Sequence, residues 1–180
     1  MQGVAGMILQ TERLLLREMT QEDFPALCRI LQDEKAMYAY EHAFTDSEAH
    51  DWLDRQIARY RQDGFGLWAV VLKETGQMIG QCGITWQDAL GIRVPEIGYL
   101  FERAFWHHGY ATEAAQACRN YAFRILGMDR VYSIIRDTNF ASQSVAKRNG
   151  MSVCGSLVKH YYGMDMPHLV FCISKQKEDF

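Results

Sequence analysis

Residues 96–115 have the pattern of a strand, a turn that contains glycine and the start of a helix, and this order strongly limits how the chain can fold. Gly109 and Ala111 carry little or no side chain, so a ligand can approach the main chain closely while successive N–H groups point outward. The first helical turn adds amides without acceptors and the positive end of the helix dipole. The segment therefore predicts a site for phosphate or pyrophosphate beside the turn.

The size and composition of the chain indicate a single folded domain. Its 180 residues are 48% hydrophobic and 23% charged, which is typical of a soluble protein with a core that needs no metal or disulfide. The net charge of -3 gives no basic footprint for nucleic acid and no polybasic patch for a membrane surface. We therefore expect neither nucleic acid nor a membrane as a partner.

The cysteines and the N-terminus both favour a cytoplasmic protein. The five cysteines are widely spaced and form no Cys-x-x-Cys pair, so reduced thiols fit better than a disulfide framework or a zinc site. Residues 1–9 have no basic leader and no long apolar run, which argues against a signal peptide or a membrane span.

Helical and strand-like patterns alternate along the chain. Apolar residues recur at helical spacing after Thr20, after Thr45 and after Gly109, and a shorter helical segment is closed by Gly150. Two strand-like runs flank a turn at Gly76 and predict a hairpin. Without a linker or repeat, this order predicts one α/β domain with a mixed sheet. The expected strands are residues 14–17, 65–71, 78–86, 94–101, 130–136, 153–162 and 168–173.

The turn resembles a loop of a known family. The spacing Trp106-x-x-Gly109-x-Ala111 is similar to the acyl-CoA pyrophosphate loop of the GNAT superfamily of N-acetyltransferases. Trp106 followed by Gly109-Tyr-Ala-Thr-Glu-Ala resembles the Rim-type branch, whose best-known members acetylate the N-termini of ribosomal proteins. That branch has glycine where this chain has His107, so a positive φ there would be adopted by His107 at some cost. The resemblance implies acetyl-CoA as the acetyl donor.

A second block supports the same resemblance. The run from Asn139 to Met151, with Ser142 and Lys147 at matching positions, resembles the family's Asn-x-x-Ser helix block. The resemblance implies a GNAT domain over residues 10–180 after an N-terminal extension of residues 1–9, with a mostly antiparallel sheet flanked by helices.

The resemblance also implies how acetyl-CoA is held. Asn139 and Ser142 would approach the pantetheine arm, and the strand that ends at Phe101 would pair with that arm through its backbone. The implied cofactor-binding residues are Tyr99, Leu100, Phe101, His107, His108, Gly109, Tyr110, Ala111, Thr112, Asn139 and Ser142.

Glu96 is the leading candidate for a catalytic base. An amine must be neutral to attack a thioester, and a nearby carboxylate, or a water that it holds, would accept the ammonium proton. Residues 96, 98 and 100 share a strand face, so Glu96 lies about 7 Å along the chain from Gly98. The alternative is a surface ion pair between Glu96 and Arg93, Arg103 or Arg136.

The other steps of acetyl transfer have candidates as well. A backbone N–H near Gly98 to Leu100 would stabilise the negative charge on the thioester oxygen. Many superfamily members protonate the CoA thiolate with a tyrosine, but that position corresponds to Ala146 in this chain. Ser142 is the catalytic substitute that the Rim-type resemblance implies, and a local hydrogen-bonding role is the alternative.

Several other residues have two interpretations. His107 and His108 fit phosphate contacts better than a metal site, because adjacent side chains diverge and no third ligand is spaced nearby. Glu113 suits the first turn of a helix structurally. The acceptor pocket is expected to draw on a set of aromatic and histidine side chains, which also suit a core or an interface. These are Tyr38, Tyr40, Phe44, Trp86, His160, Tyr161 and Tyr162.

The sequence therefore predicts an acetyl-CoA-dependent N-acetyltransferase that uses no metal and acts by direct attack of a primary amine in a ternary complex. A protein N-terminal α-amine is the first acceptor to consider. A small-molecule amine such as an aminoglycoside, polyamine or amino acid is the alternative within the same class. A CoA-binding sensor without turnover is the alternative from another class, and the oligomeric state, a homodimer included, stays open.

Overall fold

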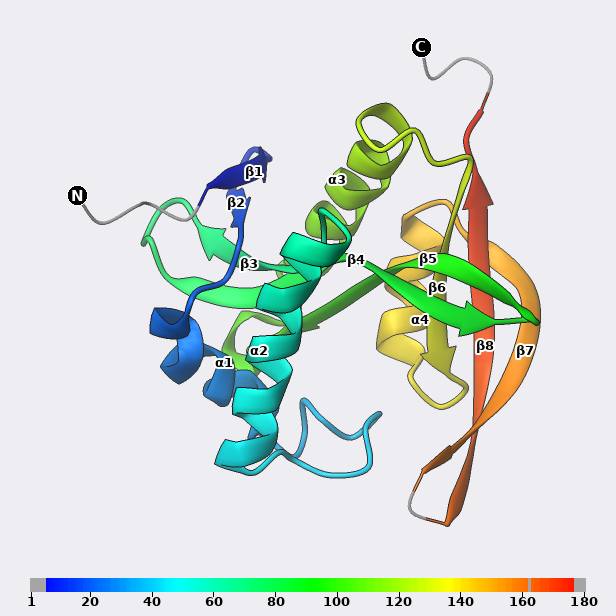
Figure 1. Cartoon of the computed structure of the whole chain (residues 1–180), viewed down its shortest axis with the longest axis horizontal. Helices are drawn as coiled ribbons and strands as arrows, with labels where there is room; N and C mark the ends of the chain where they lie inside the picture. The colour runs from blue at the N-terminus through cyan, green and yellow to red at the C-terminus, as the bar shows by residue number, and fades with distance from the viewer. Residues whose placement is uncertain (1–5, 162, 177–180) are drawn as a thin grey trace.

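The computed structural model describes residues 6–161 and 163–176, which form one sheet with helices on both faces (Figure 1). The strands are β1 (Met7–Gln10), β2 (Leu14–Arg17), β3 (Leu67–Leu72), β4 (Met78–Ala89), β5 (Ile92–Phe101), β6 (Arg130–Arg136), β7 (Ser152–Tyr161) and β8 (Met164–Ser174). The α-helices are α1 (Phe24–Leu31), α2 (Asp46–Gln62), α3 (Tyr110–Arg124) and α4 (Phe140–Arg148), and short 3-10 turns cover Gln21–Asp23 and Arg103–Phe105.

The sheet confirms the predicted α/β class with a mixed, mostly antiparallel sheet. Its strand order is β1-β2-β3-β4-β5-β6-β8-β7. Strands β3 and β4 form the predicted hairpin, and every neighbouring pair is antiparallel except β5 with β6. The long β7–β8 hairpin lies at the opposite end of the sheet from α1 and α2 (Figure 1).

Alternation along β3 assigns the helices to the two faces of the sheet. Leu67 and Ala69 belong to a buried cluster with α1 and α2, whereas Trp68 and Val70 belong to the cluster that contains α3. Because successive strand residues point to opposite faces, α1 and α2 cover one face and α3 covers the other. The sheet is therefore buried on both sides at its centre.

The structure adds one strand that the sequence analysis did not predict. Strand β1 pairs antiparallel with β2, so residues 7–9 of the expected extension belong to the sheet. Strand β8 also begins at Met164, four residues before the expected start. Among the helices of the described residues, none combines the length and apolar character that a membrane crossing needs.

Candidate functional site

Strands β5 and β6 separate and leave a gap at the centre of the sheet. Their parallel pairing is limited to Glu96 with Tyr132. The Ile97 carbonyl accepts a hydrogen bond from Ser133 Oγ at 2.8 Å, and the Phe101 carbonyl accepts one from Trp106 Nε1 at 2.9 Å. Main-chain groups two residues apart along a strand point the same way, so the N–H and C=O of the intervening residue, Tyr99, also face the gap.

The glycine turn has the backbone geometry of an anion site. Gly109 has φ +78° and is the N-cap residue of α3, and the first helical hydrogen bond runs from the Glu113 N–H to the Gly109 carbonyl at 3.0 Å. The N–H groups of Tyr110, Ala111 and Thr112 precede that bond, so they have no acceptor within the helix. A pyrophosphate can therefore be held by these amides and by the positive end of the helix dipole.

His107 has φ +63°, a positive value at the position where the Rim-type loop has glycine. A non-glycine residue in this conformation destabilises the fold by about 1–2 kcal/mol. Glycine removes that strain but loses about 0.5–1 kcal/mol more chain entropy on folding, so only part of the stabilisation remains. We therefore expect His107→Gly to raise the free energy of unfolding by up to about 1 kcal/mol and to leave acetyl-CoA affinity within about threefold. Urea denaturation and acetyl-CoA titration measure the two effects. A tenfold weaker affinity would instead assign the imidazole a direct contact.

Glu113 fastens the turn to the β1–β2 connection. Its carboxylate accepts hydrogen bonds from Thr11 Oγ1 at 2.5 Å and from Arg13 N at 3.0 Å, and it pairs with the Arg13 guanidinium at 2.6 Å. Arg13 also donates to the His108 carbonyl at 2.9 Å. These contacts agree with the structural interpretation of Glu113, because they hold the turn in place from outside the gap.

His108 makes its side-chain contacts within the turn. Its Nδ1 lies 2.7 Å from the Trp106 carbonyl, and its ring stacks on Tyr110 with centroids 5.6 Å apart. Within residues 6–161 and 163–176, no group of three or more His, Cys, Asp or Glu side chains could hold a metal ion.

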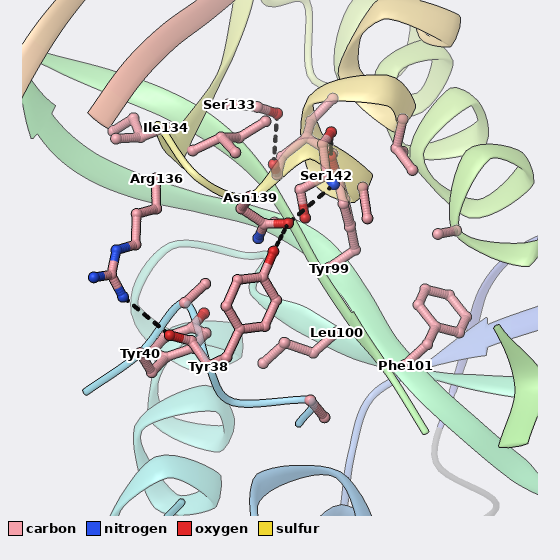
Figure 2. Close-up of a pocket in the computed structure, with 18 of the residues that line it drawn as sticks. Tyr38, Tyr40, Tyr99, Leu100, Phe101, Ser133, Ile134, Arg136, Asn139 and Ser142 are labelled. Carbon is pink, nitrogen blue, oxygen red and sulfur yellow. Dashed lines mark hydrogen bonds between the residues drawn. The ribbon is translucent and has the colours of Figure 1, made fainter. Parts of the chain in front are cut away.

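Asn139 joins the start of α4 to the loop of residues 36–44, which we call the crossing loop (Figure 2). Asn139 Oδ1 accepts hydrogen bonds from the Ser142 N–H at 3.2 Å and from the Tyr38 hydroxyl at 2.7 Å. Arg136 Nη1 donates to the Tyr38 carbonyl at 3.0 Å, and the Tyr99 hydroxyl donates to the Ser142 carbonyl at 2.8 Å. The crossing loop is thus tied to β6 and α4.

Glu96 lies at the point where β5 and β6 diverge. Its Oε2 accepts a hydrogen bond from the Ile134 N–H at 3.0 Å, and a Cβ built on Gly98 would lie 3.8 Å from Oε1, so the carboxylate lies beside the next residue of its strand face. The protein around the carboxylate raises its pKa to about 7, although the charges of Lys159 and Arg59 and the Ile134 hydrogen bond lower it. A carboxyl group with this pKa can accept and release a proton near neutral pH.

The alternative of a surface ion pair at Glu96 does not match the contacts. Arg93 lies 3.9 Å from Asp63, and Arg103 pairs with Asp33 at 2.9 Å. Arg136 donates to Tyr38, as described above. The three arginines that could have engaged Glu96 therefore have other partners.

One cavity of about 950 Å³ connects the crossing loop with the turn. Its walls include Glu96, Ser142 and every implied cofactor-binding residue except His108. Of the expected acceptor residues, Tyr38, Tyr40, Phe44 and Tyr161 line it.

Two of the expected acceptor residues that the structure describes, Trp86 and His160, do not line the cavity. Trp86 packs on Phe65 with centroids 5.8 Å apart and lies beneath the Arg93 guanidinium, so its ring completes the core. His160 pairs with Asp165 at 2.5 Å on the exposed hairpin. Tyr162 lies outside the described residues.

The sequence analysis missed several residues of the acceptor end. The structure adds Glu41, Trp52, Arg55, Arg136, Lys159 and His168 to the cavity walls. No short motif marks these residues, because they come from the crossing loop, α2, β6, β7 and β8. The apolar spacing of α2 indicated an inner face but did not reveal that part of the helix borders a cavity.

The turn, the strand backbone and the carboxylate share one cavity, which fits acetyl-CoA as the donor substrate. The space around Gly109 is open, since a Cβ there would meet only Arg13 Nη2, at 3.5 Å. The gap beside Tyr99 has room for an extended chain between β5 and β6. These features define an acyl-CoA-dependent transferase.

Comparison with known proteins identifies the family. The family model described as acetyltransferase (GNAT) domain matches residues 13–152. The chain is 35% identical over 144 residues to the protein YkkB of Bacillus subtilis, which covers 79% of this chain and 84% of that protein. It is also 35% identical over 136 residues to the N-acetyltransferase p20 of Bacillus licheniformis, with 74% and 76% covered. The chain therefore belongs to the GNAT acetyltransferase family, whose acetyl donor is acetyl-CoA.

Solved structures agree with this assignment. An acetyltransferase from Agrobacterium tumefaciens superposes with a TM-score of 0.79 at 28% identity, covering 97% of this chain and 99% of that one. A RimL ribosomal L7/L12 α-N-protein acetyltransferase in complex with coenzyme A has a TM-score of 0.78 at 18% identity, covering 94% and 98%. At this identity, the similarity to the RimL structure concerns the fold alone.

Proposed function

We propose that the enzyme acetylates a primary amine by direct attack on acetyl-CoA in a ternary complex, with Glu96 as the base and a protein N-terminal α-amine as the first acceptor. The observation that carries this proposal is Glu96, a carboxyl group with a pKa of about 7 in the same cavity as the Tyr99 backbone and the α3 N-terminus. An α-amine with a pKa near 8 is roughly a tenth neutral at pH 7, so one proton must be removed in most encounters. Glu96, or a water that it holds, accepts that proton.

The Tyr99 N–H is the group best placed to stabilise the developing oxyanion. It faces the gap beside Glu96 and belongs to a strand fixed by ten paired positions with β4. A fixed donor costs no reorganisation when the carbonyl oxygen gains charge. The amine nitrogen forms a bond to the acetyl carbon, the C–S bond breaks, and the sulfur leaves as a thiolate that takes up a proton.

The cysteines support direct transfer rather than a covalent acetyl-enzyme. All five lie in the described part of the chain, and none lines the cavity. Burial and the adjacent Cys118 raise the pKa of the Cys82 thiol well above its ordinary value, which disfavours the nucleophilic thiolate. An acetyl group therefore has no suitable thiol to pass through.

The Rim-type assignment is supported by the turn. His107 has the left-handed backbone conformation that glycine adopts readily, so the change from glycine need not alter the path of the loop. A RimL structure in complex with coenzyme A shares the fold, although its 18% identity carries no argument about the acceptor. A small-molecule amine is the alternative acceptor, because the crossing loop is tied over the cavity by Tyr38 and Arg136.

Ser142 is proposed to protonate the departing thiolate, and its contacts allow a direct test. The hydrogen bonds it makes to Asn139 and Tyr99 both use its main chain, so Ser142→Ala keeps them. We expect this variant to lower kcat by roughly tenfold or more with little change in the KM for acetyl-CoA. Ser144→Ala is the control, since that hydroxyl bonds the Phe140 carbonyl within the helix. Equal kcat values for the two variants would exclude Ser142 as the proton donor.

Thiol release tests the proposed function as a whole. Purified enzyme is incubated with acetyl-CoA and a panel of N-terminal peptides and small amines, and free thiol and acetylated product are followed together. Release that depends on an acceptor supports the proposal, and the preferred acceptor decides between peptide and small molecule. Acetyl-CoA binding without acceptor-dependent release would favour a CoA sensor.

A further inference from the structure

Glu41 presents a carboxylate whose position the proposed reaction does not explain. It belongs to the crossing loop and lines the cavity. Both of its carboxylate oxygens are closed off from solvent, and within residues 6–161 and 163–176 neither has a hydrogen-bond partner. No ion pair joins Glu41 to any basic side chain of these residues. A buried unpaired carboxylate is costly, so its presence in a cavity wall indicates a partner that arrives with a ligand.

Glu48, which lies on the same cavity wall, is a carboxylate with a structural role and can be compared with Glu41. Glu48 also lines the cavity, but its Oε2 accepts a hydrogen bond from the Thr45 N–H at 2.8 Å and its Oε1 lies 2.7 Å from His42 Nε2. It completes the capping box at the start of α2. Glu41 has no comparable contact, so a capping role does not account for it.

Aromatic rings surround this end of the cavity. The rings of Tyr40, Phe44 and Trp52 lie mutually edge to face, with centroid separations of 5.7, 6.0 and 6.4 Å, and all three residues line the cavity. An aromatic face attracts a cation, most strongly where water is excluded. The Arg55 guanidinium lies 5.8 Å from the centre of the Trp52 ring, so this ring already makes a cation–π contact.

We propose that Glu41 and the three rings bind a second positive charge on the acceptor. The substrate class is thus an amine that carries another cationic group, either a diamine or a peptide with a basic side chain near its N-terminus. This inference rests on the proposed function, since the same molecule offers its other amine to Glu96. Two other cations of this end, Arg136 and Lys159, also line the cavity, and neither is within ion-pair distance of Glu41. Arg136 donates to the Tyr38 carbonyl instead.

Matched acceptors test the second charge. Putrescine is compared with butylamine, and a peptide with lysine at its second position is compared with one that has norleucine there. We expect kcat/KM to be about 10- to 100-fold higher for the dicationic member of at least one pair, because a charge-assisted contact is added. The pair that shows the preference identifies the source of the charge. Equal rates within both pairs would overturn the proposal.

Glu41→Gln should remove this preference by lowering kcat/KM for the dicationic acceptor to about the value for the monocationic one. Its unfolding temperature should be unchanged or higher, since an uncompensated carboxylate has been removed. Glu34→Gln is the control, because it removes the same charge from an exposed site outside the cavity. Equal losses for both members of a pair, together with a lower unfolding temperature, would make Glu41 a structural residue and overturn the proposal.

A binding measurement separates this proposal from the proposed function. Putrescine and butylamine, or the two peptides, are titrated into enzyme saturated with coenzyme A, and the heat of binding is measured without turnover. Tighter dicationic binding that Glu41→Gln abolishes supports the site even if no acetylation occurs. Acetylation of monocationic amines without any dicationic preference would leave the proposed function in place and reject the site.

Discussion

Glu96→Gln is expected to lower kcat/KM for acetyl transfer by about a hundredfold or more near neutral pH, because glutamine cannot accept the ammonium proton. Glutamine keeps the shape of the side chain and an oxygen that can accept the Ile134 N–H. Steady-state rates with saturating acetyl-CoA measure the effect. Glu102→Gln is the control, since Glu102 directly follows β5 but pairs with Arg29 at 3.2 Å. A loss of less than about threefold would exclude Glu96 as the base.

The pH dependence gives the same variant a second signature. Glu96 has a pKa of about 7, so wild-type kcat/KM should rise as the pH passes through about 7 and the carboxylate forms. The Gln variant should lose this inflection and follow only the ionisation of the amine. The difference between the two enzymes should be largest near and below neutral pH and should shrink as the amine becomes neutral without help. An inflection kept by the variant would assign it to another group.

Stability should change in the opposite direction from activity. A carboxyl group whose folded pKa is raised stabilises the fold below its unfolded pKa and loses that contribution as the pH rises through the folded value, here about 7. Above pH 7 the charged Glu96 therefore destabilises the fold. Glu96→Gln should raise the unfolding temperature there, by roughly 2–4 °C for each kcal/mol of desolvation relieved.

Gly109→Ala is expected to weaken acetyl-CoA binding by about 10- to 100-fold, the second large effect. The residue has φ +78° at the start of α3, and alanine would strain this conformation and so shift the amides that follow it. Loss of one or two charge-assisted hydrogen bonds to phosphate accounts for the size of the effect. Calorimetric titration with acetyl-CoA measures it.

Gly127→Ala separates the ligand effect from backbone strain. Gly127 lies beyond the other end of α3 with φ +67°, and a Cβ there would meet nothing within 4 Å. Both alanine variants should lose about 1 kcal/mol of stability, but only Gly109→Ala should lose affinity. Equal affinities in the two variants would show that the turn does not hold the pyrophosphate.

Much of the fold followed from periodicity, because most elements bury one regular face. The glycine turn and the helix after it were predicted within a few residues, since Gly109 and Gly127 bracket the apolar spacing of α3. Strand β1 was missed because it is only four residues long and partly exposed. Its extended conformation is defined by pairing with β2. The order of the strands could not be derived from periodicity, since it depends on contacts between distant segments.

The donor side of the site was easier to predict than the acceptor side for a physical reason. Pyrophosphate recognition depends on local backbone geometry, which leaves a contiguous pattern around Gly109. The acceptor end depends on side chains brought together by the fold, such as Tyr38 and Asn139, which are 101 positions apart yet share a hydrogen bond. Trp86 was wrongly expected in the acceptor pocket and Glu41 was missed for the same reason. A position in a loop or strand does not reveal which cavity the residue borders.

The central claim is that one cavity brings acetyl-CoA and an amine together beside Glu96. The most direct measurement follows free thiol and acetylated amine in the same reaction, with the wild-type enzyme and with Glu96→Gln, across neutral pH. Equal amounts of thiol and acetylated product, formed only with an acceptor and slowed about a hundredfold in the variant, are the predicted result. Thiol release that needs no acceptor, or equal rates in the two enzymes, would contradict it.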